Sequence, residues 1–211
     1  MATATVTHSV NPELTSLPDL DIERDPGVED APEETAEAPR PGSRSLAALR
    51  ISTGFVFLWA FLDKAFGFGY ATPHDAAWVR GGSPTEGFLS HVAVGPLEGW
   101  FHDIAGAPWA DWLFMMGLLG VGVAVIAGIG LRAAAVSGTA MMALMWMAEW
   151  PLAKTLSTGE PSMSTNPIVD YHVIYALALV VVALTAAGDR WGLGRMWARL
   201  PIVRRHPGVL R

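Results

Sequence analysis

Four long apolar stretches alternate with polar segments along the chain. The first extends from Leu46 to Tyr70 and is interrupted by few polar side chains, at Arg50, Ser52, Thr53, Asp63 and Lys64. A helix rises about 1.5 Å per residue and a bilayer core is about 30 Å thick, so the uninterrupted run 54–62 is too short to cross it. We therefore expect a span over 46–70 that buries Asp63 and Lys64 in the outer third of the membrane.

A second apolar region, from Trp112 to Ala148, carries a single charge at Arg132. As one helix it would extend roughly 55 Å, nearly twice the thickness of the core. It is therefore predicted to form two spans, 112–130 and 132–149, that turn at the glycines before Arg132. The last span, 168–187, follows Asn166-Pro167, a typical helix start. The predicted fold is all-α, an integral membrane four-helix bundle.

Basic residues predict the orientation of these spans. Arginines gather near both termini and at the turn between the second and third spans, whereas only Lys64, Arg80 and Lys154 lie towards the other side. The positive-inside rule then places both termini in the cytoplasm. Tryptophans near both ends of the spans are typical of membrane interfaces.

The loop from Ala71 to Asp111 is long for a simple connection. It contains a capping box at Ser83-Pro84-Thr85-Glu86 and a second helix start at Gly95-Pro96, each followed by apolar residues at helical spacing. We expect short amphipathic helices there, between the first and second spans, on the outer surface of the membrane.

Composition supports a membrane protein, with 51% hydrophobic residues and a mean hydropathy of +0.33. Residues 1–44 carry ten acidic residues and three arginines, which predicts a disordered acidic leader in the cytoplasm. Residues 45–190 would form the membrane domain, and residues 191–211 a basic cytoplasmic tail. The chain has no cysteine, so we expect no iron–sulfur cluster, and no pair of histidines faces across the spans to hold haem. No surface for nucleic acid is indicated.

The predicted topology brings charged residues from different spans to one level at the outer end of the bundle: Asp63, Lys64, Glu149, Asp170 and His172. Such a group suits a quinone head group. Lys64 or His172 would bind a carbonyl oxygen, and Asp170 or Glu149 would relay protons. The outer cations Lys64, Arg80 and Lys154, with Asp63 beside the first, could also attract a small oxyanion.

Each of these residues also has a purely structural interpretation. Lys64 can extend to the interface and pair with a carboxylate. Asp170 favours the start of any helix, and Glu149 can simply mark the interface. A single histidine such as His172 is commonly hydrogen-bonded to a neighbour. No ligand spacing specifies a metal, so we predict no metal site.

Several motifs together resemble the DoxX family over roughly residues 44–200. They are Arg50-x-x-x-Gly54, Lys64, the segment Asp170-Tyr171-His172-Val173-Ile174-Tyr175-Ala176-Leu177, Gly188, and Gly192-Leu193-Gly194-Arg195. The resemblance implies a four-helix protein of the bacterial cytoplasmic membrane, related to a subunit of thiosulfate:quinone oxidoreductase and to a maturation protein for methylamine dehydrogenase. The family often has glycine three residues before the lysine, where this chain has Phe61, so packing and access near Lys64 differ.

Three hypotheses follow. The first is a membrane subunit of a quinone-linked oxidoreductase, oxidising a small sulfur oxyanion at the outer face. The second is a non-catalytic anchor or assembly factor that recruits redox proteins, and the sequence does not decide between an enzyme and this alternative. A small-solute transporter is the third and least favoured hypothesis, because the sequence shows no pair of broken helices, which many transporters have. A ridge of Gly120, Ala124 and Gly128 favours packing inside the bundle over a homo-oligomer interface.

Overall fold

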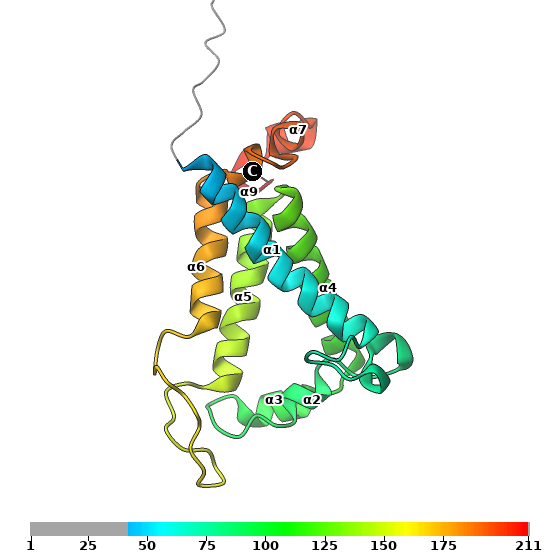
Figure 1. Ribbon diagram of the computed structural model, residues 1–211, viewed down its shortest axis with the longest axis vertical. Helices are drawn as coiled ribbons and strands as arrows, with labels where there is room; N and C mark the ends of the chain where they lie inside the picture. Colours follow the sequence, from blue (N-terminus) through cyan, green and yellow to red (C-terminus); the bar gives the residue numbers. More distant parts are fainter. Residues whose placement is uncertain (1–41, 211) are drawn as a thin grey trace, which may run out of the picture. The chain divides into compact units, whose positions relative to one another are not determined.

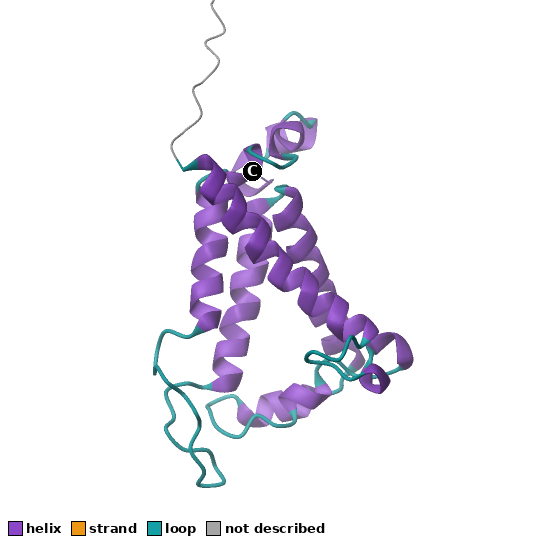
Figure 2. Cartoon of the chain, viewed as in Figure 1, coloured by secondary structure: helices purple, strands orange, loops and turns teal. Residues whose placement is uncertain are grey.

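The computed structural model describes residues 42–210, which belong to one compact unit. All regular elements in this range are helices, which confirms the predicted all-α class for these residues (Figures 1 and 2). The predicted acidic leader lies outside the described residues, apart from its last three positions.

Four long helices dominate this range: α1 (Ser43–Phe66), α4 (Pro108–Ala127), α5 (Leu131–Glu149) and α6 (Tyr171–Leu184). The first three are long and apolar enough to cross a membrane. With 14 residues, α6 is also apolar but extends only about 21 Å. The division of the region 112–148 into two helices at a glycine turn is confirmed, since α4 ends at Gly128 and α5 starts after Gly130.

These four helices pack around one core. Helix α1 packs mainly against α4 and α5 mainly against α6, and contacts of α4 with α5 and of α1 with α6 complete a ring. The core contains Phe57, Met115, Leu118, Val125 and Leu179. We call the end where α1 begins and α6 finishes the tail end, and the opposite end the loop end (Figure 1).

Helix α1 crosses α4 closely because both helices present glycine at the crossing. A Cβ atom on Gly54 would lie 2.8 Å from the backbone nitrogen of Ile126, and one on Gly122 would lie 2.7 Å from the nitrogen of Leu58. Only glycine permits this approach. The oblique course of α1 carries its last turn towards the start of α4 and away from the start of α6 (Figure 1).

Helix α1 ends at Phe66, four residues before the expected limit of the first span. Gly67 terminates it in a left-handed conformation, and its N–H donates to the Asp63 carbonyl oxygen at 2.7 Å. The chain then turns, so residues 67–70 do not extend the helix as the apolar pattern suggested. Hydropathy alone did not reveal this stop signal.

The long loop forms a short helix after each predicted start, α2 (Glu86–Leu89) and α3 (Glu98–Ile104). It also contains two short 3₁₀ helices that the sequence did not indicate, η2 (His74–Ala76) and η3 (Trp78–Arg80). The Ser83 hydroxyl accepts from the Glu86 N–H at 3.1 Å, which is one half of the predicted capping box. Helices α2 and α3 lie across the loop end, where Val92 and Phe101 pack against Ala148 at the end of α5 (Figure 1).

The predicted basic tail is folded. After α6, the chain forms η4 (Ala187–Asp189), α7 (Gly194–Ala198), α8 (Pro201–Arg205) and α9 (Pro207–Leu210). The Leu193 N–H donates to the carbonyl oxygen of Ala127 at 2.8 Å, which fixes this segment to the end of α4. These helices have only three to five residues each, too short for a periodic apolar pattern to indicate them.

Candidate functional site

Asp170 caps the start of α6 with one oxygen and holds a histidine with the other. Its Oδ1 accepts from the N–H groups of His172 and Val173, at 3.0 and 3.2 Å. This is the N-cap geometry that aspartate favours. Its Oδ2 lies 2.8 Å from Nδ1 of His172. The structural interpretation of Asp170 is therefore correct, and the same side chain also orients the imidazole.

His172 is 1% exposed, and among the described residues its Nε2 has no hydrogen-bond partner. Because an ionised carboxylate only accepts, Nδ1 carries the proton that it shares with Asp170. In the neutral imidazole this leaves a lone pair on Nε2. A buried nitrogen that is oriented by a carboxylate and lacks a partner of its own is rare in a side chain that serves packing alone.

Glu149, the last residue of α5, joins this pair. Its Oε1 accepts from the Tyr171 hydroxyl at 2.6 Å, and its ligand atoms lie within 4.8 Å of those of Asp170 and His172. The Tyr171 and His172 rings also lie next to each other, with centroids 4.0 Å apart. The two helix ends thus form one connected group, Glu149–Tyr171–Asp170–His172, which we call the loop-end cluster.

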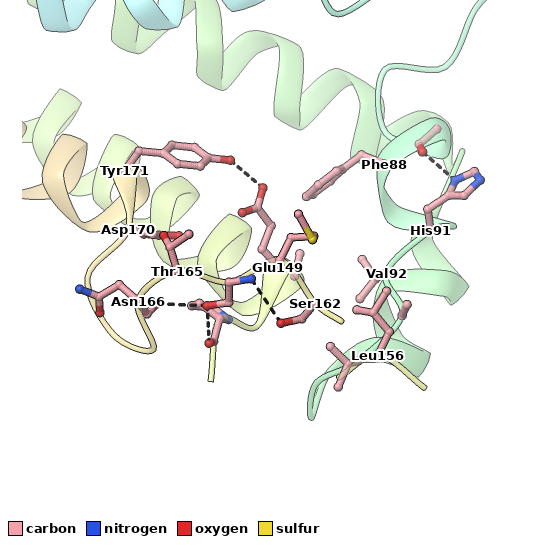
Figure 3. A pocket seen from close by; sticks show the side chains of 17 residues that line it. Phe88, His91, Val92, Glu149, Leu156, Ser162, Thr165, Asn166, Asp170 and Tyr171 are labelled. Carbon is pink, nitrogen blue, oxygen red and sulfur yellow. Dashed lines mark hydrogen bonds between the residues drawn. The ribbon is translucent and has the colours of Figure 1, made fainter. Parts of the chain in front are cut away.

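A pocket of about 500 Å³ opens beside the loop-end cluster. Figure 3 shows Glu149, Asp170 and Tyr171 on one wall, and Phe88, His91 and Val92 of the α2 segment on another. The loop between α5 and α6 completes it with small polar side chains, among them Ser162, Ser164, Thr165 and Asn166. His172 does not line this pocket and lies behind Asp170. A ligand in the pocket would therefore meet the carboxylates of Glu149 and Asp170, while the His172 imidazole is hydrogen-bonded to Asp170 from behind.

The structure does not bring Asp63 and Lys64 to this cluster. Both lie in the last turns of α1, which ends at a different corner of the loop end from α6 (Figure 1). The Asp63 carboxylate is buried and accepts from the N–H groups of Tyr70 and Ala71, at 3.3 and 2.9 Å, so it stabilises the turn after α1. Lys64 is partly exposed and makes no hydrogen bond or ion pair within residues 42–210. Of the five residues predicted to converge, only Glu149, Asp170 and His172 lie together.

The two remaining candidates, Arg80 and Lys154, are exposed and do not line the pocket. Arg80 lies in η3, and Lys154 in the loop after α5. The pocket itself presents two carboxylates, which repel an anion. A small oxyanion is therefore a poor ligand for this pocket.

Sequence reasoning missed two buried charged residues. Arg50 was noted as a basic residue near a span end and as part of a family motif, without a structural role, but it is 0% exposed and donates to backbone carbonyls of two separate segments. The acceptors are the oxygens of Val125, Ile126, Arg190 and Trp191. The Arg-x-x-x-Gly spacing was the available signal, since it places Arg50 and Gly54 on the helix face that contacts α4.

Asp111 is the second buried residue. At the start of α4, its Oδ1 accepts from the hydroxyl of Ser83 and from both the N–H and the hydroxyl of Thr85, at 2.7 to 2.9 Å. It ties the α2 segment, one wall of the pocket, to the membrane helices. Asp111 was predicted to be the last residue of the loop, so the sequence did not indicate this role.

A divalent cation could use the same donors, because Glu149, Asp170 and His172 each present one ligand atom within the 4.8 Å limit. However, the protonated Nδ1 of His172 donates to one Asp170 oxygen, and the other Asp170 oxygen caps α6. An ion bound through Nδ1 would have to displace the His172–Asp170 bond.

The described residues therefore define an all-helical protein with three helices suited to crossing a membrane and a polar cluster at one end of them. Comparisons with protein-family models, with curated proteins and with solved structures find no match.

Proposed function

We propose that the chain is a four-helix integral membrane protein with both termini in the cytoplasm, and that it is the quinone-binding subunit of a redox system. Helix α6 would cross as the fourth span with help from the segments that flank it. The exposed Trp109 and Trp112 lie at the start of α4. Trp191 is also exposed and lies in the segment that is attached to the other end of α4. The length of α4 separates these tryptophans by about one bilayer thickness. The arginines of residues 190–205 put the tail end inside.

The depth of the cluster supports a lipid-soluble ligand. From Leu131 to Glu149, α5 rises about 28 Å, close to the thickness of the hydrocarbon core. Glu149 would then lie at its outer boundary. A quinone head group sits at this level of the bilayer while its tail remains among the lipids, and apolar side chains at the pocket such as Phe88 and Val92 suit a ring.

The observation that carries the proposal is the loop-end cluster beside the pocket. Oxidation of a quinol releases two protons and two electrons. Glu149 and Asp170 line the pocket as the two proton acceptors, and the hydrogen bond from Nδ1 of His172 holds the Asp170 carboxylate in position. The electrons would go to the redox centre of a partner protein. In the reverse direction, the same groups would supply protons to a quinone.

Quinone binding to the purified full chain tests the proposal. Decylubiquinone should quench tryptophan fluorescence, with a dissociation constant at least about tenfold weaker in Glu149→Gln and Asp170→Asn than in the unmodified protein, because each variant loses a charged acceptor. Lys64→Gln is the matched control, since Lys64 lies outside the cluster, and it should bind normally. Equal binding by all variants, or loss only in Lys64→Gln, would contradict the proposal.

A non-catalytic anchor or assembly factor is the second candidate. It is favoured by the folded basic segment at the tail end, which presents a structured surface. In that case, deletion of residues 1–41 or the triple change Arg199→Gln/Arg204→Gln/Arg205→Gln should remove redox proteins from a pull-down of the full chain. An unchanged set of partners would count against it.

A further inference from the structure

The segment from Arg190 to Leu210 combines positive charge with exposed apolar side chains. It contains five arginines and no acidic residue. The guanidinium-bearing side chains of Arg199, Arg204 and Arg205 are exposed and make no hydrogen bond or ion pair within the described part of the chain. Their charge is therefore available to a ligand.

Apolar side chains lie exposed among these arginines. Trp191, Met196 and Ile202 are 61%, 67% and 60% exposed. Leu193, Leu200 and Val209 are exposed as well. Large apolar residues interleaved with arginine are typical of segments that lie in the interface of a membrane.

This segment is held firmly in place. Val203 is buried, and the Trp197 indole N–H donates to the Leu210 carbonyl oxygen at 2.5 Å. Arg132, at the start of α5, donates to the carbonyl oxygen of Gly208 at 2.8 Å. The arginines and apolar groups are therefore presented by a folded surface, which we call the tail cap (residues 190–210).

The tail cap also lies at the level where lipid head groups would be. Its residue Leu193 bonds directly to Ala127, the last residue of the membrane-crossing helix α4. A surface attached to the end of such a helix meets the head-group layer, where apolar side chains can enter the acyl boundary and arginines can meet phosphate.

We propose that the tail cap is a docking surface for anionic phospholipids. Arg199, Arg204 and Arg205 bind the phosphate groups, and the neighbouring apolar side chains insert beside them. Charge complementarity selects this occupant, because zwitterionic lipid offers no net negative charge. The proposal is independent of quinone binding, since the tail cap and the pocket lie at opposite ends of the helices (Figure 1).

The test uses the full chain purified in neutral detergent, with its thermal unfolding followed during titration with phosphatidylglycerol or phosphatidylcholine. Phosphatidylglycerol should raise the midpoint temperature and phosphatidylcholine should not. In the triple variant Arg199→Gln/Arg204→Gln/Arg205→Gln, the half-saturating amount of phosphatidylglycerol should rise at least about tenfold. The charge control at the loop end, Arg80→Gln/Lys154→Gln, should respond like the unmodified chain.

Three outcomes would overturn the proposal. The first is a triple variant that elutes as a single folded species and keeps the full response. The second is equal stabilisation by phosphatidylcholine and phosphatidylglycerol. The third is the same effect from inorganic phosphate at the same phosphate concentration, which would show a simple anion site. Loss of the response at high salt would support the proposal, because the contacts are exposed to solvent and therefore screened.

Discussion

The two ends of the helices each bury a side chain that can carry charge, but they treat it differently. At the tail end, Arg50 is surrounded by four carbonyl acceptors from the end of α4 and from the segment after α6. At the loop end, His172 has one partner, Asp170, and its Nε2 has none among the described residues. Only the loop end has a pocket of about 500 Å³ beside the buried group.

This difference distinguishes a structural role from a chemical one. A buried charge with most of its donors paired stabilises a fold, because helix C-terminal carbonyls and a guanidinium satisfy one another. A buried group that keeps an open position can still accept a proton. The four predictions below test this comparison.

The largest effect is expected at Arg50. Arg50→Ala removes the guanidinium donor from four carbonyl oxygens, one in a buried and three in partly buried contacts, and should lower the free energy of unfolding by about 3 to 5 kcal/mol. Arg50→Lys should recover only part of this, because an ammonium lacks the planar fork. Thermal unfolding in detergent measures the loss. Arg44→Ala, an exposed change on the same helix, is the control, and an equal loss there would refute the special role of Arg50.

Asp170 should come next. Asp170→Ala removes both the cap of α6 and the partner of His172, at a cost of about 2 to 3 kcal/mol. Asp170→Asn keeps a capping oxygen and should lose about half as much. If both variants unfold at the same temperature as the unmodified protein, the bond between Asp170 and His172 does not hold the cluster together.

Asp111 should show a smaller effect. Asp111→Asn weakens the hydrogen bonds from Ser83 and Thr85, and we expect a loss of about 1 kcal/mol. The α2 segment should also become more open. Faster amide hydrogen exchange over residues 83–92, with unchanged exchange in α5, is the expected result. Uniform change along the chain would show that Asp111 acts on the whole fold.

Lys64 should show the smallest effect. Removing a charge that makes no hydrogen bond or ion pair within residues 42–210 should leave stability within about 0.5 kcal/mol or raise it slightly. Lys64→Ala and the matched change Lys64→Gln would be compared by thermal unfolding. A large destabilisation would mean that the end of α1 contains a polar contact as important as those at the loop-end cluster.

Most of the helical architecture could be predicted from the sequence. Apolar length and the glycine turn before Arg132 indicated α4 and α5, because a bilayer limits how long one span can be. The capping box before Glu86 indicated a helix start. The start predicted from Asn166-Pro167 was too early, because α6 begins at Tyr171 with Asp170 as its cap and ends at Leu184. The predicted end of the first span, at Tyr70, lies four residues beyond the end of α1 at Phe66. The prediction was wrong because glycine and the aromatic residues after Phe66 are as apolar as a helix interior.

The site was predictable only where it depends on one pair of adjacent helices. Glu149 and Asp170 end and begin consecutive helices, so topology alone placed them together. Asp63 and Lys64 depend on the angle at which α1 crosses α4. The Gly54 and Gly122 contact sets that angle, and no count of apolar residues specifies it. The acceptors of Arg50 are backbone carbonyl oxygens, which every residue has, so the sequence does not indicate them.

The position of those acceptors has a consequence for how the protein is made. Arg50 lies in α1, whereas the carbonyls of Arg190 and Trp191 are synthesised about 140 residues later. Until then, the arginine has only the end of α4 to bind. Each newly made chain therefore carries an incompletely paired arginine until the segment after α6 has been synthesised. A chain that stopped before residue 190 would keep this arginine only partly paired.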